Sequence, residues 1–222
     1  MRGGHAVDFS LLLDNMDLFL EGFRTTIVAS LIALLGSFLL GTVLAVFRIA
    51  PVKPLNWLGT AYVEFFRNIP LLIIAFFVYI GLPSVGIRLD GMTSGVIALI
   101  IYTSAFIAEA IRAGILSVPE GQMEAARSSG LSYNQAMTLV VLPQAIKIVI
   151  PPLGNQFINL VKNSSILGII AGLDLMYYGD LISLKTYVVF DVYILVGLFY
   201  LVLTIPLSLG VGYLEKRLAR SH

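Results

Sequence analysis

The chain has 222 residues, of which 58% are hydrophobic and 12% are charged, and its formal net charge is +1. Soluble domains contain about 45–50% apolar and about 25% charged residues, so this composition excludes an ordinary soluble domain and indicates a membrane protein. The nearly neutral charge gives no reason to expect nucleic-acid binding. The absence of cysteine excludes disulfides and thiol chemistry.

Residues 1–20 are acidic and interrupted, with no basic segment followed by an apolar core, so they do not have the pattern of a secretory signal peptide. We expect them to form an extracytoplasmic segment, with an interfacial helix over Leu11–Phe19. Residues 21–218 are then expected to form one transmembrane domain.

Four uncharged segments are long enough to cross a bilayer as helices. They are Thr25–Phe47, Asn68–Ile87, Gly91–Ala108 and Val192–Leu214. About 20 apolar residues cross the hydrocarbon core as a helix. A helix satisfies its own backbone hydrogen bonds in lipid, and the alternation typical of a lipid-facing β-barrel strand is absent.

A fifth span is predicted between Lys147 and Lys162, continuing through Ser164–Gly172, although it contains two prolines and several polar side chains. Four of these polar residues recur every three positions and should share one helical face, namely Gln156, Asn159, Lys162 and Ser165. Polar side chains inside a membrane face protein or water rather than lipid. One interpretation is a substrate path. The other is hydrogen bonding between helices, where such bonds contribute only about 0.6 kcal/mol on average.

Five spans place the two ends of the chain on opposite sides of the membrane. With the C-terminus in the cytoplasm, the cytoplasmic segments hold Arg48, Lys53, Arg127, Lys216, Arg217 and Arg220, and the outer segments hold Arg2, Arg24, Arg88 and Lys185. This bias follows the positive-inside rule. The sequence therefore predicts an all-α, polytopic membrane protein with five transmembrane helices and its N-terminus outside.

A polar segment over residues 117–143 separates the third and fourth predicted spans. Its first helix is expected over Val118–Ser129, because Ser117 and Glu120 have the spacing of a capping box and Pro119 is tolerated in a first turn. Gly130 suits the left-handed conformation that ends a helix.

A second helix of this polar segment is expected over Tyr133–Leu142. Ser132 and Gln135 form another capping-box pattern at its start, and Pro143 begins the next element. Two capped helices with one hinge residue between them describe a rigid cytoplasmic hairpin.

The first helix of the hairpin carries two adjacent small residues, Ala125 and Ala126, between Glu124 and Arg127. Small side chains allow a partner to approach the helix backbone, and flanking charges of both signs give that partner an orientation. This face suits docking into a groove. The alternative is an ordinary surface hairpin, in which alanine serves helix propensity.

Two acidic–basic pairs lie near the ends of the predicted spans. Glu64 and Arg67 are three residues apart, as are Glu109 and Arg112. The structural interpretation is a pair of salt bridges within helices, which anchor the second span and brace the third span against the hairpin. The functional interpretation places Glu64 or Arg67 at the cytoplasmic mouth of a path.

The hairpin sequence resembles the EAA motif of the integral membrane subunits of ATP-binding-cassette (ABC) importers. The resemblance lies in Glu124-Ala-Ala-x3-Gly130-x9-Val140-x-Leu142-Pro143, with Val140 where isoleucine is commoner. The branch that imports polar amino acids is resembled at Pro119-x-Gly121-Gln122, Leu142-Pro143-Gln144-Ala145, Arg67-Asn68-x-Pro70-Leu71 and Lys162-Asn163-Ser164-Ser165.

The resemblance implies a type I importer fold with five spans in each permease subunit. Two permease subunits, either identical or close homologues, would form one path, and an extracytoplasmic solute-binding protein would deliver the substrate. A dimer of ABC ATPase subunits would bind the hairpins. The expected coupling residues are Pro119, Glu120, Gly121, Glu124, Ala125, Ala126, Arg127 and Gly130. The expected path residues are Glu64, Arg67, Gln156, Asn159, Lys162 and Ser165.

The sequence also bears on catalysis and cofactors. It contains no G-x-x-x-x-G-K-[ST] phosphate loop, and its histidines are His5 and His222, at the two ends. We therefore expect no enzyme activity, no metal site and no cofactor bound by this chain, with ATP and Mg²⁺ on the partner ATPase.

The expected function is transport of a polar amino acid across the bacterial cytoplasmic membrane, such as glutamine, glutamate or cystine. The neutral side chain of Gln156 disfavours arginine or lysine. Two other classes stay open from the sequence. One is a secondary transporter driven by an ion gradient, which would need an intramembrane carboxylate relay. The other is a membrane-anchored assembly or sensor subunit without a path.

Overall fold

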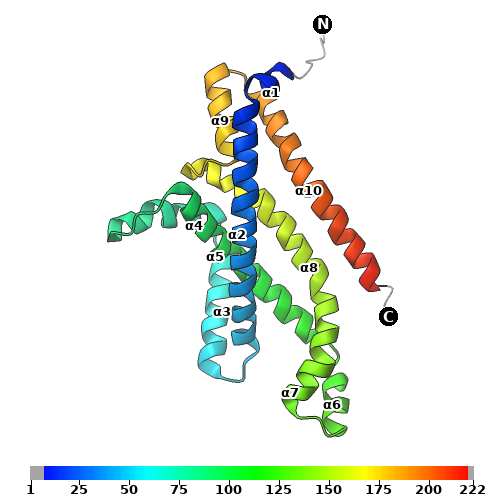
Figure 1. The fold of residues 1–222 in the computed structure, drawn as a ribbon. Coiled ribbons are helices and arrows are strands. Elements are labelled where there is room, and N and C mark those ends of the chain that lie inside the picture. Colours follow the sequence, from blue (N-terminus) through cyan, green and yellow to red (C-terminus); the bar gives the residue numbers. More distant parts are fainter. Residues whose placement is uncertain (1–7, 220–222) are drawn as a thin grey trace. The chain divides into compact units, whose positions relative to one another are not determined.

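The computed structural model describes residues 8–219, and this part of the chain is helical almost throughout and contains no strand (Figure 1). The all-α class predicted from the sequence is confirmed. The elements are, in order, α1 (Ser10–Asp14), α2 (Met16–Ile49), α3 (Lys53–Arg67), α4 (Leu71–Phe76), the π-helix η1 (Phe77–Gly81), the 3-10 helix η2 (Leu82–Val85), α5 (Gly91–Leu116), α6 (Glu120–Ser128), α7 (Tyr133–Ala136), the π-helix η3 (Met137–Val141), α8 (Leu142–Asn163), the 3-10 helix η4 (Ser164–Ile170), α9 (Leu175–Thr186) and α10 (Phe190–Ala219).

Four helical segments of the described chain are long and apolar enough to cross a membrane. They are Met16–Ile49, Gly91–Leu116, Tyr133–Ile170 and Phe190–Leu218. The first, second and fourth contain the predicted spans Thr25–Phe47, Gly91–Ala108 and Val192–Leu214, and the third contains the predicted proline-containing span except for its last two residues. Pro151 and Pro152 lie inside α8 without ending it.

The predicted second span over Asn68–Ile87 is helical only over Leu71–Val85, so its predicted bounds are too wide. Asn68 instead ends α3, and the helical segment that follows begins only at Leu71 and changes from α to π to 3-10 geometry before Val85. Pro70 holds an extended backbone (φ −59°, ψ 136°), and this ψ value lies outside helical geometry, so the helix is interrupted there. A fifth crossing exists only if α3 and Leu71–Val85 count together as one broken span.

The predicted interfacial helix over Leu11–Phe19 is divided in the structure. α1 ends at Asp14, Asn15 leaves helical geometry with φ −127°, and α2 begins at Met16. The side chain of Asn15 donates a hydrogen bond to the backbone oxygen of Leu11 at 2.9 Å, which replaces the helical bond lost at the break. The first seven residues of the expected N-terminal segment lie outside the described residues.

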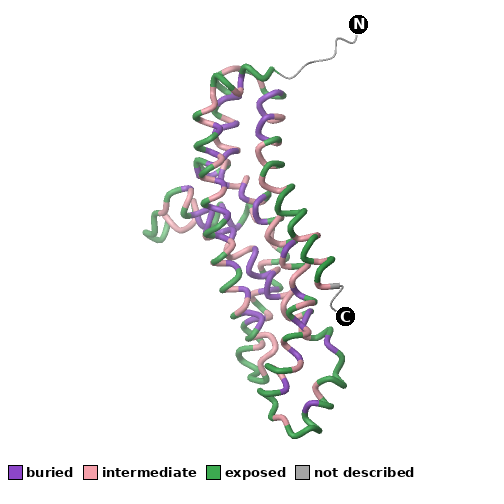
Figure 2. Tube along the Cα trace, turned by 45° about the vertical axis from the view of Figure 1, so that its right-hand side comes forward, coloured by how far each residue is buried: buried purple, intermediate pink, exposed green. Residues whose placement is uncertain are grey.

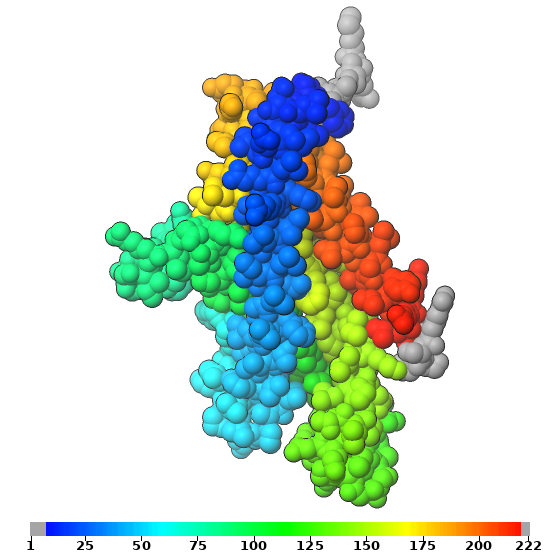
Figure 3. Space-filling model, in the orientation of Figure 1, coloured from blue at the N-terminus to red at the C-terminus, as the bar shows by residue number. Residues whose placement is uncertain are grey.

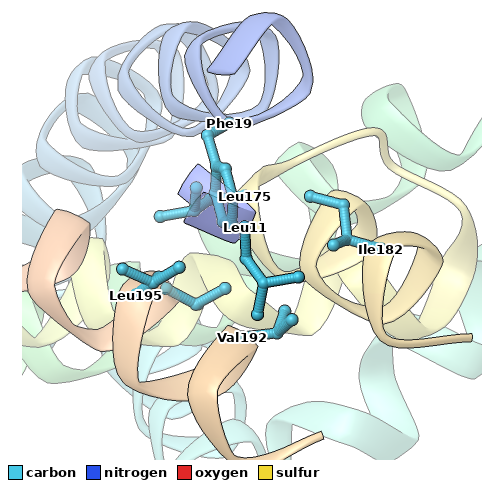
Figure 4. Close-up of a cluster of buried hydrophobic side chains, with 7 residues drawn as sticks. Leu11, Phe19, Leu175, Ile182, Val192 and Leu195 are labelled. Carbon is cyan, nitrogen blue, oxygen red and sulfur yellow. The ribbon is translucent and has the colours of Figure 1, made fainter. Parts of the chain in front are cut away.

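The described chain forms two compact units. The first contains the chain up to Leu35, residues 70–100 and residues 159–206. Its largest core cluster joins α1, α2, α9 and α10, and Figure 4 shows the side chains of Phe19, Leu175, Ile182 and Leu195 gathered together. Gly22 allows α2 to approach this cluster, because a Cβ atom there would lie 2.8 Å from the Cα atom of Leu175.

The second unit contains residues 36–69, residues 101–158 and the chain from Leu207. One core cluster packs α2, α3 and α5 around Leu44, Val63 and Ala105. A separate cluster under the polar hairpin contains Val118, Val141 and Ala145, so the hairpin has its own small apolar base.

Large apolar side chains stay exposed along the long helices. Leu35, Leu39 and Leu209 are 66%, 67% and 70% exposed. Exposed residues occur along the lengths of these helices and not only at their ends (Figure 2). Such faces are unfavourable in water and suit contact with lipid or with other membrane helices.

Candidate functional site: a coupling hairpin and two polar regions

The polar segment predicted to be a hairpin is a helical hairpin in the structure. Figure 1 shows α6 and α7 next to each other, beyond the N-terminal end of α8. In the space-filling view this part of the second unit forms a separate lobe (Figure 3). The side chain of Gln144 in α8 donates a hydrogen bond to that of Gln122 in α6 at 3.2 Å. This bond and the apolar cluster around Val118 hold the first helix of the hairpin against the start of the span that follows.

The capping box predicted at Ser117 and Glu120 is wrong. The first helix begins at Glu120, and its N-cap residue is Pro119, which makes no side-chain hydrogen bond to the helix. The hydroxyl of Ser117 donates to the backbone oxygen of Gly114 at 2.7 Å, so it belongs to the end of α5. The extended backbone of Pro119 (φ −55°, ψ 135°) separates Ser117 from the new helix.

The left-handed conformation predicted for Gly130 is confirmed, with φ +91°. The N–H of Gly130 donates to the oxygen of Arg127 at 3.0 Å, and the N–H of Leu131 donates to the oxygen of Ala126 at 3.3 Å. These two bonds form a Schellman motif that closes the first helix. The guanidinium of Arg127 adds a bond of 2.9 Å to the oxygen of Leu131, so the turn is fixed on both sides.

The second predicted capping box is confirmed. The side-chain oxygen of Gln135 accepts from the N–H of Ser132 at 2.8 Å, and the hydroxyl of Ser132 accepts from the N–H of Gln135 at 3.3 Å. The helix that follows does not end at Leu142 as expected. It passes through η3 into α8, because the π-helical turn adjusts the bonding pattern just before Pro143, which has no N–H to donate.

The two central alanines of the hairpin differ in exposure. Ala126 is 7% exposed and packs inward, whereas Ala125 is exposed, together with Glu124 and Arg127. Glu120 and Gly121 are also exposed, and a Cβ atom at Gly121 would meet no atom within 4 Å. The small accessible face predicted for docking is therefore formed by Ala125 and Gly121, and Ala126 supports it from behind.

The charged residues near the span ends form one cluster in the second unit. Arg112 donates to both carboxylate oxygens of Glu109, at 3.2 and 2.7 Å, which confirms the expected pair. The expected pair between Glu64 and Arg67 is not formed. Arg67 lies 3.9 Å from Glu109, and Glu64 lies 3.6 Å from Arg48.

Sequence reasoning missed the centre of this cluster, Arg48 at the end of α2. Its side chain is only 7% exposed and forms an ion pair with Glu109 in α5. The cluster therefore joins α2, α3 and α5, and no hydrogen bond or ion pair within the described chain connects it to the hairpin as expected for Arg112. A basic residue at the end of an apolar helix was the available signal, but its partner lies 61 residues away.

The polar row predicted on the fourth span follows α8 and enters η4. Gln156 is half-buried, and Asn159 and Lys162 are exposed, so their side chains are available to solvent or to a partner. None of these three side chains makes a hydrogen bond to another residue in the part of the chain that the structure describes. Ser165 differs, because it lines a cleft of about 330 Å³ in the first unit.

The cleft at Ser165 has a mixed polar and apolar lining. Asn163 and Asp180 supply an amide and a carboxylate, and Ile169 and Met176 supply apolar walls. The hydroxyl of Tyr193 donates to Asp180 and fixes that carboxylate. Asp180 was not predicted as a site residue, because it lies on α9, apart in sequence from the polar row.

A second polar group missed by the sequence analysis surrounds the fully buried Asp174, at the start of α9 in the first unit. Its carboxylate accepts from the N–H of Tyr177 at 3.0 Å and from the hydroxyl of Tyr200 at 3.3 Å. Burial raises the pKa of Asp174 to about 6, against the opposing effect of these hydrogen bonds. The hydroxyl of Thr26 accepts from the next N–H, that of Leu175, at 3.1 Å, so this polar group connects α2, α9 and α10.

Comparisons with known proteins identify the family. Residues 19–220 match the family described as the binding-protein-dependent transport system inner membrane component. The chain is 69% identical to the "Probable glutamine ABC transporter permease protein GlnM" of Bacillus subtilis (strain 168). This similarity extends over 216 residues and covers 97% of this chain and 100% of that protein. It is 36% identical over 213 residues to the "Glutamate transport system permease protein GluC" of Corynebacterium efficiens, covering 90% of this chain and 93% of the relative.

A solved structure described as an "amino acid ABC transporter with histidines" has the same fold, with a TM-score of 0.90 and 38% identity over 96% of this chain and 100% of that one. A chain from a solved structure of the MetNI methionine ABC transporter also has this fold, with a TM-score of 0.77 and 21% identity, over 92% of this chain and 98% of that one. The chain therefore belongs to the family of binding-protein-dependent transport system inner membrane components, the permease subunits of ABC transporters.

Proposed function

We propose that this chain is the transmembrane subunit of an ATP-driven importer for a polar amino acid, with glutamine as the first candidate substrate. The observation that carries the proposal is the polar hairpin, which is closed at Gly130, capped at Ser132 and exposes a small face at Ala125. The identity of 69% with a protein named as a probable glutamine permease supports the choice of substrate.

The hairpin would couple the permease to a separate ATPase dimer, which binds ATP and Mg²⁺. Both of its helices have fixed ends, so a force applied at Glu124 and Ala125 passes into α8 without being lost in a flexible loop. A partner shifts a conformational equilibrium only through contacts that differ between the two states. The exposed face of α6 would provide those contacts, with Glu120, Gly121 and Arg127 around its centre.

Substrate would pass along the polar row of α8 and η4. Ser165, Asn163 and Asp180 offer a hydroxyl, an amide and a carboxylate in one cleft of the first unit, which suits an ammonium group and a side-chain amide. Asn159 and Lys162 extend the polar surface of the same helix. We place Glu64 and Arg67 in the structural charge cluster rather than in the path, because each forms an ion pair there.

The proposed assembly contains two permease subunits, two ATPase subunits and an extracytoplasmic solute-binding protein in a bacterial cytoplasmic membrane. The hairpin and the C-terminus would face the cytoplasm and the N-terminus would face outward. The basic residues of the second unit, including Arg48, Lys53 and Arg127, agree with this orientation under the positive-inside rule.

Proteoliposomes containing the permease, its ATPase and its binding protein test the proposal. We expect ATP-dependent uptake of labelled glutamine, with uptake of arginine far weaker. A matched preparation with a non-hydrolysable ATP analogue is the control. Uptake that continues without ATP and collapses with the ion gradient would contradict the proposal, as would the absence of any uptake in the complete system.

A further inference from the structure

A cleft of about 290 Å³ lies in the second unit where the ends of α2 and α5 meet the start of the second hairpin helix. Its lining combines cationic and apolar side chains. Arg48 and Arg112 supply the charge, Tyr133 supplies a hydroxyl, and Leu116 and Met137 supply apolar walls. This combination differs from the cleft at Ser165, which has a carboxylate and no basic residue in its lining.

Hydrogen-bond donors remain unused at this cleft. Arg112 uses Nε and one terminal nitrogen for Glu109, and its other terminal nitrogen has no hydrogen-bond partner among the described residues. The Nε atom of Arg48 is buried and has no partner in the described part of the chain. A buried donor without a partner is costly, so a ligand that accepts hydrogen bonds would stabilise this region.

The surrounding charge cluster also has an excess of positive charge. It contains three arginines and two glutamates, namely Arg48, Arg67, Arg112, Glu64 and Glu109. One positive charge is therefore not balanced inside the cluster. An anion in the cleft would balance it.

The cleft lies where two helices of spanning length end. α2 and α5 are both long and apolar enough to span, and their last residues, Ile49 and Leu116, lie at the cleft. Just after α2 the chain continues with Lys53 and Trp57, and Trp57 is 73% exposed. Tryptophan and lysine are typical of the boundary between lipid and water.

We propose that this cleft binds the phosphate headgroup of an anionic membrane lipid. Guanidinium groups match phosphate oxygens in geometry and charge, and basic pockets between membrane helices on the cytoplasmic side suit such headgroups. Arg48 and Arg112 would bind the phosphate, and Leu116 and Met137 would contact the acyl chain. A free phosphate ion is also an anion but would leave the apolar wall uncovered.

The bound lipid would connect the hairpin to the membrane spans. Tyr133 and Met137 belong to the second half of the hairpin, whereas Arg48 and Arg112 belong to the span ends. The lipid would therefore hold together two parts that the ion pairs leave unconnected. This role does not depend on the substrate.

The test measures lipid binding to the purified full-length permease in detergent by native mass spectrometry. Phosphatidylglycerol and phosphatidylcholine with the same acyl chains are titrated separately, and inorganic phosphate is titrated as a third probe. We expect phosphatidylglycerol to bind at least about tenfold more tightly than phosphatidylcholine. We expect millimolar inorganic phosphate to leave this binding unchanged. Competition by inorganic phosphate at that level would overturn the lipid assignment.

Two exposed leucines provide matched variants, because both side chains lie at the surface of the second unit and only one of them lines the cleft. Leu116 is 64% exposed in the cleft, and Leu139 is 65% exposed outside its lining. Leu116→Glu adds a negative charge to the lining of the cleft and should weaken phosphatidylglycerol binding about fivefold, whereas Leu139→Glu should change it less than about twofold. Equal effects of the two variants would overturn the proposal.

A second pair of variants removes positive charge from the cluster. Arg112→Gln should weaken phosphatidylglycerol binding about tenfold, and Arg67→Gln, which removes a charge outside the cleft lining, should weaken it less than about threefold. Thermal unfolding of each variant without added lipid shows whether it folds. If Arg112→Gln fails to fold, the leucine pair still decides the outcome. Equal affinity of the wild type for the two lipids would also overturn the proposal.

Discussion

Gly130 has a backbone conformation, with φ +91°, that residues with a Cβ atom rarely adopt. No atom lies within 4 Å of a Cβ atom built at this position, so a larger side chain would fit. Glycine is favoured here because of the backbone conformation. The Schellman bonds to Arg127 and Ala126 hold the residue in this conformation. A substitution here therefore changes the angle between the hairpin helices without adding a clash.

The first prediction concerns coupling at this residue. Gly130→Val should lower the amount of substrate imported per ATP hydrolysed by tenfold or more, because a β-branched residue resists a positive φ at a cost of about 1–2 kcal/mol and the hairpin would change shape to relieve it. Gly130→Asn is the matched control, since asparagine tolerates this region. Both quantities are measured in the same proteoliposomes. Wild-type coupling in the valine variant would remove the hinge role.

Asp174 gives a prediction for pH dependence. Its pKa is raised from 3.8 to about 6 in the folded state, so the folded state binds this proton more tightly than the unfolded state. The stabilising effect of the proton is complete below about pH 4 and is lost as the pH rises to about 6, with a total of about 3 kcal/mol. Thermal unfolding of the detergent-solubilised wild type should show this loss, and Asp174→Asn should not. The same pH profile in both proteins would contradict the assignment.

At the scale of single elements, the starts of the two hairpin helices show which local sequence patterns determine where a helix begins. Ser132 and Ser117 have the same capping-box spacing to a glutamine and a glutamate, but only Ser132 forms the box. Pro119 makes the difference, because its fixed backbone starts the helix at Glu120 and leaves Ser117 at the end of α5. The first pattern failed because Pro119, which we expected in the first turn of the helix, is instead its N-cap residue.

This contrast gives a matched pair of variants. Ser132→Ala should destabilise the start of the second hairpin helix by about 1 kcal/mol, which increases amide hydrogen exchange at Gln135 about fivefold. Ser117→Ala removes a hydroxyl that caps no helix and should leave exchange at Glu120 and Gly121 within about twofold of the wild type. An equal increase in amide hydrogen exchange in both variants would contradict the assignment of a cap to Ser132 alone.

Element boundaries also show where sequence reasoning succeeded. The long uncharged segments gave α2, α5 and α10, because spanning length and apolar composition are local properties of the chain. The predicted start of the second span was wrong at Pro70, whose extended backbone begins a new helix at Leu71 within an apolar run that hydropathy treats as uniform. The turn at Gly130 was predicted because glycine after a polar helix is itself a local signal.

At the scale of the whole molecule, the features that the sequence did not predict depend on distant partners. Arg48 and Glu109 are 61 residues apart, and Asp174 and Tyr200 are 26 apart. No helical spacing connects such pairs, so only the packing of each unit reveals them. The expected salt bridge between Glu64 and Arg67 failed for the same reason, since each residue finds a partner on another helix.

The candidate sites also differ in whether their residues are close together in the sequence or come from different helices. The residues expected to couple lie on or next to one short helix, α6, although Ala126 is turned inward, and their coupling role stays a prediction. The polar row on α8 was predicted by its spacing. The cleft at Ser165 also needs Asp180 from α9, which spacing along one helix cannot supply. The proposal that import is driven through the hairpin therefore depends on a hairpin that the sequence predicts and the structure contains.

The most direct test of that claim is cross-linking from the hairpin in intact membranes. The chain has no cysteine, so Glu124→Cys creates a unique attachment point for a short cross-linker. Leu184→Cys is the control, because Leu184 is 74% exposed on α9 and lies on the proposed extracytoplasmic side. We predict that position 124 captures the ATPase subunit and that position 184 does not. Failure to capture the ATPase from position 124 in membranes that contain the assembled transporter would contradict the account.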